Sequence, residues 1–179
     1  VTSRQWFIKT MDARETLLAR GRELGWHPPY MQARLENWVN GLAGDWCVSR
    51  QRFFGVPFPV WYRVRDDGSV DHDARLLPSE DRLPIDPSTD VPDGYTADQR
   101  DRPGGFSGDP DIMDTWATSS LSPQIAGGWI EDPDLFARVF PMDVRPQAHD
   151  IIRTWLFSTM LRAEYEHQSL PWKNAAISG

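Results

Sequence analysis

Apolar positions recur with helical spacing in three stretches of the chain. Over residues 12–24 the leucines fall on one helix face, with Asp12 as a candidate N-cap and Gly25 as a stop. Residues 28–42 begin with two prolines, which suit the first turn of a helix. Residues 150–165 carry the most regular apolar stripe. Its members are Ile151, Ile152, Trp155, Leu156, Leu161 and Tyr165.

Shorter apolar runs predict strands over residues 56–64, 139–144 and 175–178, and residues 133–138 predict a short helix. A strand, a long helix and a second strand in that order indicate a βαβ unit with parallel strands and a right-handed crossover. The predicted fold class is therefore α/β, a parallel sheet with flanking helices. Ligands of such sheets bind at the carboxyl ends of the strands, so residues 147–150 are the expected place for a nucleotide.

Residues 66–110 differ from the rest because Asp, Pro and Gly dominate them. A hairpin about residues 66–68 is the regular feature that we expect there. We consider the stretch too short for a second packed domain. Residues 1–179 are therefore predicted to form one domain with a loop-rich excursion at about 66–110.

Composition narrows the function. The 179 residues are 40% apolar, which indicates a globular chain, and the net charge of −7 argues against a protein that binds nucleic acid by bulk charge. The single Cys47 cannot form an internal disulfide, and the four histidines are scattered without zinc-site spacing. Apolar runs fall short of the roughly 20 residues that span a bilayer. We expect a cytoplasmic protein.

Nine tryptophans are a high load for this length, and most of them must pack in the interior. Trp116 follows a short extended stretch and precedes a cluster of hydroxyl residues, which suits a turn into a helix N-terminus. We expect Trp116 to form one wall of a small apolar pocket. Ordinary core packing is the more common role for a single tryptophan, and that alternative stays open.

The polar residues that are candidates for ligand binding also have structural roles as alternatives. The carboxylate of Asp150 can accept hydrogen bonds from a ribose diol, although a helix N-cap, worth ~1 kcal/mol, is the favoured role from sequence alone. His149 could polarise a ligand carbonyl or fill a turn. Arg50 and Arg52, set among aromatics, could hold a nucleic-acid backbone, or they could pair with nearby acids.

Four separated segments together resemble the valyl-tRNA synthetase family of class I aminoacyl-tRNA synthetases. They are residues 45–55, 57–62, 111–120 and 143–155. The resemblance covers nearly the whole chain. It implies the second half of a Rossmann-like catalytic domain, after the point where an editing domain is inserted. It also implies an enzyme that activates valine with ATP and Mg to valyl-adenylate and transfers it to tRNA(Val), together with the remaining domains of that enzyme.

Residue roles follow from the resemblance. In that family two tryptophans and an aliphatic residue enclose the valine side chain, and the matching positions are Trp61, Trp116 and Ile112. The positions that match the adenylate-binding turn and the strand end near the adenine are Gln147, Ala148, His149, Asp150 and Gly179. Ala148 stands where the family commonly has glycine. Arg50 and Arg52 lie near the junction with the editing insertion and are assigned to tRNA.

Some family features are missing from the sequence. Neither the His-Ile-Gly-His nor the Lys-Met-Ser-Lys-Ser signature occurs, so we assign no catalytic residue. Many relatives carry a cysteine-based zinc knuckle between the two pocket tryptophans, but residues 66–110 hold no cysteine, and we predict no zinc. Val1 is not a start residue, so we expect the chain to be part of a longer polypeptide.

Two other functions remain open. An isoleucyl- or leucyl-tRNA synthetase would share the fold but carry a pocket for a larger side chain. A tryptophan-rich module that binds carbohydrate or single-stranded nucleic acid would need aromatics exposed on one platform.

Overall fold

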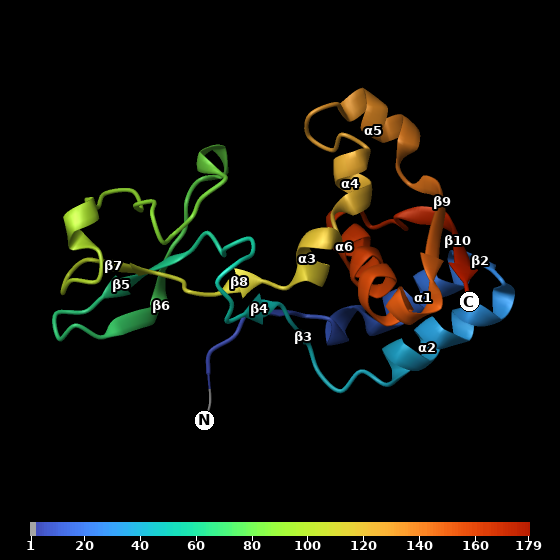
Figure 1. Cartoon of the computed structure of the whole chain (residues 1–179), viewed down its shortest axis with the longest axis horizontal. Helices are drawn as coiled ribbons and strands as arrows, with labels where there is room; N and C mark the ends of the chain where they lie inside the picture. The colour runs from blue at the N-terminus through green and yellow to red at the C-terminus, as the bar shows by residue number, and fades with distance from the viewer. Residues whose placement is uncertain (1–2) are drawn as a thin grey trace. The chain divides into compact units, whose positions relative to one another are not determined.

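The computed structural model describes residues 3–179, which divide into two compact units (Figure 1). Of the described residues, unit 1 consists of 3–48 and 115–179, and unit 2 of Ser49–Asp114. Each unit has a three-stranded β-sheet of its own.

Unit 1 is built on a parallel sheet whose three strands lie in the order β2 (Gly25–His27), β10 (Trp172–Ser178) and β9 (Met142–Ala148). The predicted βαβ unit is confirmed, because β9 leads through a helical segment into its neighbour β10 (Figure 1). That segment consists of η5 (His149–Ile151), the π-helical η6 (Ile152–Leu156) and α6 (Phe157–His167).

The boundaries of β9 differ from the prediction. The strand begins at Met142, because the preceding helix α5 (Pro133–Val139) takes up the first residue of the predicted run. It continues to Ala148, which pairs with Ser178 of β10. Gln147 and Ala148 therefore belong to the strand, and only His149 and Asp150 lie in the turn after it.

Helices α1 (Arg14–Glu23) and α2 (Gln32–Asn40) form the core of unit 1 together with the sheet and the η6–α6 segment. The side chains at its centre are at most 1% exposed: Leu17, Leu35, Val39, Ile152, Leu156, Met160 and Leu161. The helical periodicity is thus confirmed, but two boundaries were wrong. Asp12 lies in η1 (Met11–Ala13) and does not cap α1, and Gly25 opens β2 while Leu24 ends the helix.

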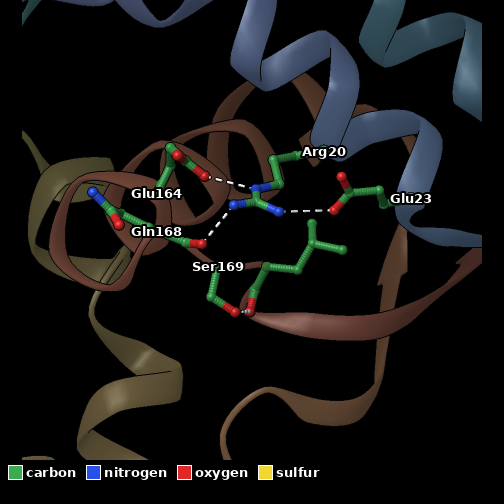
Figure 2. A network of polar contacts seen from close by, with 6 residues as sticks. Arg20, Glu23, Glu164, Gln168 and Ser169 are labelled. Atoms are coloured by element: carbon green, nitrogen blue, oxygen red, sulfur yellow. Dashed lines mark hydrogen bonds and ion pairs between the residues drawn. The ribbon is translucent and has the colours of Figure 1, made fainter.

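Two arginines of α1 fix the helices to one another. The Arg20 guanidinium donates to Glu164 at 2.7 Å, to Glu23 at 2.9 Å and to the carbonyl of Gln168, where a left-handed residue ends α6 (Figure 2). The bond to Glu164 is the main reason that the pKa of Arg20 lies above its usual value. Arg14 donates to the carbonyls of Val39, Asn40 and Leu42 at 2.8–3.1 Å, so it satisfies groups that the end of α2 leaves open.

Shorter elements complete unit 1. β1 (Phe7–Ile8) pairs antiparallel with β3 (Trp46–Cys47), and η2 (Pro29–Met31) precedes α2. Helices α3 (Thr115–Ser119) and α4 (Ser122–Ala126) lead towards α5. The predicted helix over 133–138 is confirmed, and Asp132 caps it by accepting a hydrogen bond from the Leu135 N–H at 2.9 Å.

Unit 2 packs around a core of its own, which the sequence did not predict. In its antiparallel sheet β5 (Trp61–Val64) lies between β6 (Val70–Leu76) and β7 (Phe106–Gly108). Trp61, Ile85 and Phe106 are buried together against this sheet. The stretch that the sequence predicts as a loop-rich excursion therefore contributes Ile85 and Phe106 to a small buried core.

Other details of unit 2 were anticipated. The hairpin about residues 66–68 is confirmed, since β5 and β6 pair across it and Gly68 adopts a φ of +82° that suits glycine. β4 (Ser49–Arg50) pairs antiparallel with β8 (Ile112–Met113) at the two ends of the unit. Two short 3-10 turns, η3 (Glu80–Arg82) and η4 (Ala97–Gln99), lie between β6 and β7.

The tryptophans behave as packing residues. All nine lie in the described part of the chain, and each is buried or half-buried. Residues 3–179 thus offer no exposed indole platform, which removes the feature that a tryptophan-rich binding module requires. Over the same residues, no helix has the length and apolar character to cross a membrane.

His167 ends α6 inside an aromatic cluster. Its ring lies 5.0 Å from Trp129, 5.3 Å from Phe136 and 4.8 Å from Phe140, measured between ring centroids. Its Nε2 atom has no hydrogen-bond partner among residues 3–179. Burial lowers the pKa of His167, and the neighbouring Glu166 opposes that effect in part.

This burial predicts a pH dependence of stability. The folded pKa of His167 lies below the unfolded value of about 6.5, so the unfolded chain binds the proton more readily and stability falls as the pH drops through that value. We expect urea midpoints at about pH 7.5 and about pH 5.5 to differ more for the wild type than for His167→Phe. Equal losses in the two proteins would contradict the assignment.

Candidate functional site

The carboxyl edge of the parallel sheet brings distant residues together. β9 and β10 run in the same direction, and Ala148 pairs with Ser178 at their ends. His149 and Gly179 therefore leave the sheet side by side, although they are far apart in the sequence. The parallel arrangement places the five residues matched to an adenylate site, residues 147–150 and Gly179, at one edge, where α/β sheets bind ligands.

His27 lies at the same edge and is not among the residues predicted from the sequence. It is the last residue of β2, and it pairs in register with Ala176 of β10. Its Nε2 atom lies 3.2 Å from Oδ1 of Asn174. A strand of three residues is too short to produce a recognisable alternation, so no local signal marked it.

Asp150 is an exposed residue in the 3-10 turn His149–Ile151. The residue that caps this turn is Ala148, and no side chain makes a capping hydrogen bond. The capping role favoured from sequence is therefore wrong. No donor among residues 3–179 hydrogen-bonds the Asp150 carboxylate, so both of its oxygens are open to a ligand.

Arg145 and Gln147 alternate with Pro146 and so share one face of β9. The Arg145 guanidinium lies 3.3 Å above the Trp155 ring, and burial lowers its pKa. The Nε atom of Arg145 and the Oε1 atom of Gln147 are buried without partners among the described residues. The positively charged Arg145 thus lies three residues before the end of β9, about 10 Å along the strand. No sequence pattern marks Arg145 as a candidate residue.

Trp116 lies in the first turn of α3, not at the end of an extended segment, because β8 ends at Met113 and the helix begins at Thr115. The ring is half-buried and packs against the core of unit 1. The hydroxyl cluster that follows does not cap a helix start. Ser120 donates to the Ala117 carbonyl at 2.5 Å, so the cluster folds back on carbonyls of its own segment.

Ile112 in unit 2 has a fixed position. It pairs with Arg50 of β4, forms a bridge with Pro57 and is 8% exposed. A Cβ atom added at Gly55 would lie 2.3 Å from Cδ1 of Ile112, so only glycine permits this approach.

Trp61 is fully enclosed within unit 2. The ring is 0% exposed and packs with Ile85 and Phe106. Its Nε1 atom donates to the carbonyls of Pro87 and Asp90, both at 3.2 Å. The indole therefore has a structural role in the core of unit 2.

The two arginines that are candidates for a tRNA contact differ in their surroundings. Arg50 forms an ion pair with Asp114 and donates to the Ser49 carbonyl at 2.7 Å, which is the pairing alternative named from the sequence. Arg52 is exposed. The adjacent Gln51 donates to Asp111 at 3.0 Å, so the segment around Arg52 is attached to β8.

Three carboxylates lie buried before and around β8. Asp109, Asp111 and Asp114 are 8%, 9% and 4% exposed. Asp109 accepts a hydrogen bond from the Tyr62 hydroxyl at 2.7 Å, which together with burial raises the pKa of Tyr62. These acids have structural partners, and within residues 3–179 no group of three His, Cys, Asp or Glu side chains is arranged to hold a metal ion.

Comparison with known proteins identifies the class. The model of the family "tRNA synthetases class I (I, L, M and V)" matches residues 1–179, and the chain belongs to this family.

Curated relatives narrow the comparison to one specificity. The chain is 64% identical to the valine–tRNA ligase of Thermobifida fusca and 60% identical to that of Salinispora arenicola. Both alignments cover 100% of the chain and 21% of the relative. The chain thus spans about a fifth of the length of these enzymes.

Solved structures agree on the fold. Mycobacterium tuberculosis methionyl-tRNA synthetase in complex with methionyl-adenylate matches 97% of the chain and 26% of its own, with a TM-score of 0.57 and 15% identity. A leucyl-tRNA synthetase of Agrobacterium radiobacter K84, in a ternary complex, matches 75% of the chain and 20% of its own, with a TM-score of 0.55 and 20% identity. The mixed α/β fold with its small parallel sheet therefore matches part of class I catalytic domains.

The contact between Gly55 and Ile112 predicts a position-specific effect. Gly55→Ala should destabilise the protein by about 1–3 kcal/mol, because the new methyl group forces Ile112 and β8 to move. Gly44→Ala is the matched control, since no atom lies within 4 Å of its added Cβ. Urea denaturation of both variants measures the difference. A loss of stability for Gly44→Ala that equals the loss for Gly55→Ala would refute the assignment.

Proposed function

We propose that the chain supplies the valine side-chain pocket and part of the adenylate ribose site of a valyl-tRNA synthetase. In that enzyme valine is activated with ATP and Mg and is then transferred to tRNA(Val). The observation that carries the proposal is the open carboxylate of Asp150 at the sheet edge where β9 and β10 end side by side.

The edge suits a nucleotide. An ionised carboxylate accepts hydrogen bonds only, so the two oxygens of Asp150 match the two hydroxyls of a ribose. Gly179 follows β10 at the same edge, and its missing side chain permits a flat base to approach the backbone. The Arg145 guanidinium, which has no carboxylate partner among residues 3–179, adds a positive charge on the side of β9.

The valine pocket is assigned to Trp61, Ile112 and Trp116. The half-buried ring of Trp116 and the fixed position of Ile112 support two of these assignments, while Trp61 rests on the sequence match alone because its ring is enclosed. Rigid apolar walls select for size. Isoleucine would overpack such a pocket, and each methyl group that a smaller amino acid lacks forfeits about 0.8 kcal/mol of burial.

The remaining assignments concern the tRNA contact, catalytic residues and zinc. Arg52 is the better candidate for a tRNA contact, because the charge of Arg50 is engaged by Asp114. No catalytic residue is assigned within the chain, and no zinc. Stabilisation of the ATP phosphates needs the imidazole and cationic groups of the two signature motifs, which the sequence lacks.

Ligand-induced stabilisation of the full-length enzyme tests the proposal. Valyl sulfamoyl-adenylate should raise Tm more than the isoleucyl or threonyl analogue. Asp150→Asn should weaken binding of the valyl analogue roughly 10- to 100-fold, since charged hydrogen bonds to the ribose are lost. Asp143→Asn is the control, because the carboxylate of this exposed residue of β9 pairs with Lys173 at the surface. A larger shift with the isoleucyl analogue would favour the sibling enzyme instead.

Activity of residues 1–179 alone provides an independent check. We expect no valine-dependent exchange of pyrophosphate into ATP by the isolated chain, because it lacks the groups that stabilise the phosphates. The full-length enzyme serves as the positive control in the same assay. Measurable valine-dependent turnover by the isolated chain would show that the missing motifs are dispensable.

A further inference from the structure

The indole of Trp155 connects the parallel sheet of unit 1 to helix α3. Trp155 belongs to the π-helical η6 and is 6% exposed. Its N–H donates to the carbonyl of Ser119, the last residue of α3, at 3.0 Å. The Arg145 guanidinium of β9 lies 3.3 Å above the ring, and the centroid of the Trp172 ring of β10 lies 5.5 Å away. One side chain thus contacts both strands of the candidate adenylate edge and α3.

The backbone at Trp155 is held by buried hydroxyl groups. The Trp155 carbonyl accepts hydrogen bonds from the Thr159 hydroxyl at 2.6 Å and from the Ser158 hydroxyl at 3.2 Å. Both hydroxyl residues are at most 1% exposed. Single π turns such as η6 occur frequently at functional sites. The direction of the indole is therefore fixed by its own turn as well as by the rings and the cation around it.

Helix α3 is too short to hold its own position. It spans five residues, little more than one turn, and a helix of that length depends on tertiary contacts. The carbonyls at its end need donors from outside the helix. The Ser119 carbonyl receives one from Trp155 and another from the Ser122 hydroxyl at 2.5 Å. Because Ser122 follows in the same segment and moves with it, the bond from Trp155 is the one that ties this carbonyl to η6.

A second contact ties the residue after α3 to α6. Arg162 donates to the hydroxyl of the buried Ser120 at 3.3 Å, and the Ser120 N–H donates to the Trp116 carbonyl at 3.1 Å. Helix α3 lies beside α6 (Figure 1), and the Trp116 ring packs against the core that contains Trp155. The position of the Trp116 ring therefore depends on the contacts that hold the end of α3.

We propose that Trp155 is a positioning residue for the valine pocket and acts through Trp116. The proposal rests on the proposed function, in which Trp116 forms one wall of that pocket. A wall held at a fixed place rejects isoleucine, because the additional methylene group overpacks the pocket. A wall that can shift admits this group and holds valine less closely. The N–H of Trp155, by fixing the carbonyl end of α3, keeps the wall in place.

Trp155→Phe in the full-length enzyme tests the proposal. The variant keeps a ring beside Arg145 and Trp172, and the Ser119 carbonyl keeps the Ser122 hydroxyl as a donor. Amino-acid-dependent pyrophosphate exchange gives kcat/KM for valine and for isoleucine. The ratio of the two should fall roughly 5- to 50-fold, because small displacements of a positioning group have effects of this size. A loss of folded enzyme lowers both values equally and leaves the ratio unchanged.

Trp26→Phe is the matched control. Trp26 is also buried, and its indole N–H donates to the Gly21 carbonyl of α1 at 2.7 Å. This variant loses the same kind of hydrogen bond at a place without contact to α3, so its Tm should fall while its ratio stays at the wild-type value. An unchanged ratio in Trp155→Phe, or an equal fall in Trp26→Phe, would overturn the proposal.

A double-mutant cycle shows whether Trp155 acts through Trp116. Trp116→Phe should lower the ratio by itself, and Trp155→Phe added to it should change the ratio little further, because the wall that Trp155 holds is already altered. Losses that simply multiply would contradict an action through Trp116.

The positioning role and the proposed function fail in different ways. A ratio that falls in Trp116→Phe but not in Trp155→Phe refutes the positioning role and leaves the pocket assignment intact. A ratio that does not change in Trp116→Phe refutes the assignment of Trp116 to the valine pocket, which belongs to the proposed function.

Discussion

The parallel pairing of β9 with β10 is the constraint on which the rest of unit 1 depends. Two neighbouring parallel strands need a connection that crosses from one end of the sheet to the other, and η5, η6 and α6 provide it. The crossover buries Ile152, Leu156 and Leu161, and these side chains give α1 and α2 a surface to pack on. The same pairing makes both strands end at one edge, which is why His149 and Gly179 emerge side by side although thirty positions separate them in the chain.

Polar contacts set the geometry of this packing more than its strength. The bond of Arg20 to Glu164 joins α1 to the last turns of α6, and Arg14 closes the end of α2. These side chains are partly accessible to solvent, so each contact contributes little compared with the buried leucines and isoleucines. Their importance is positional, since each helix end is tied to another helix and the crossover cannot slide along the sheet.

Local patterns foretold the helices, the βαβ unit and the hairpin, because each rests on a period or a turn within about twenty residues. Features that depend on contacts between residues distant in the sequence were not predicted. Trp61, Ile85 and Phe106 form a core without any shared period, so unit 2 looked like a loop. Asp150 looked like a cap because the helix after it was assumed to be regular, whereas it begins with 3-10 and π turns. The convergence of residues 147–150 with Gly179 could be foreseen from strand order, but the enclosure of Trp61 could not.

The pairing of β4 with β8 brings the two ends of unit 2 together, and no sequence pattern predicts this pairing. The chain enters the unit through one of these strands and leaves it through the other, and the two are hydrogen-bonded neighbours. The first and last strands of unit 2 are therefore neighbours, and the residues between them form an insertion that begins and ends at the same place. Residues can be gained or lost between β4 and β8 without shifting the register of the parallel strands, so unit 2 is free to change in length while the carboxyl edge of the parallel sheet stays unchanged.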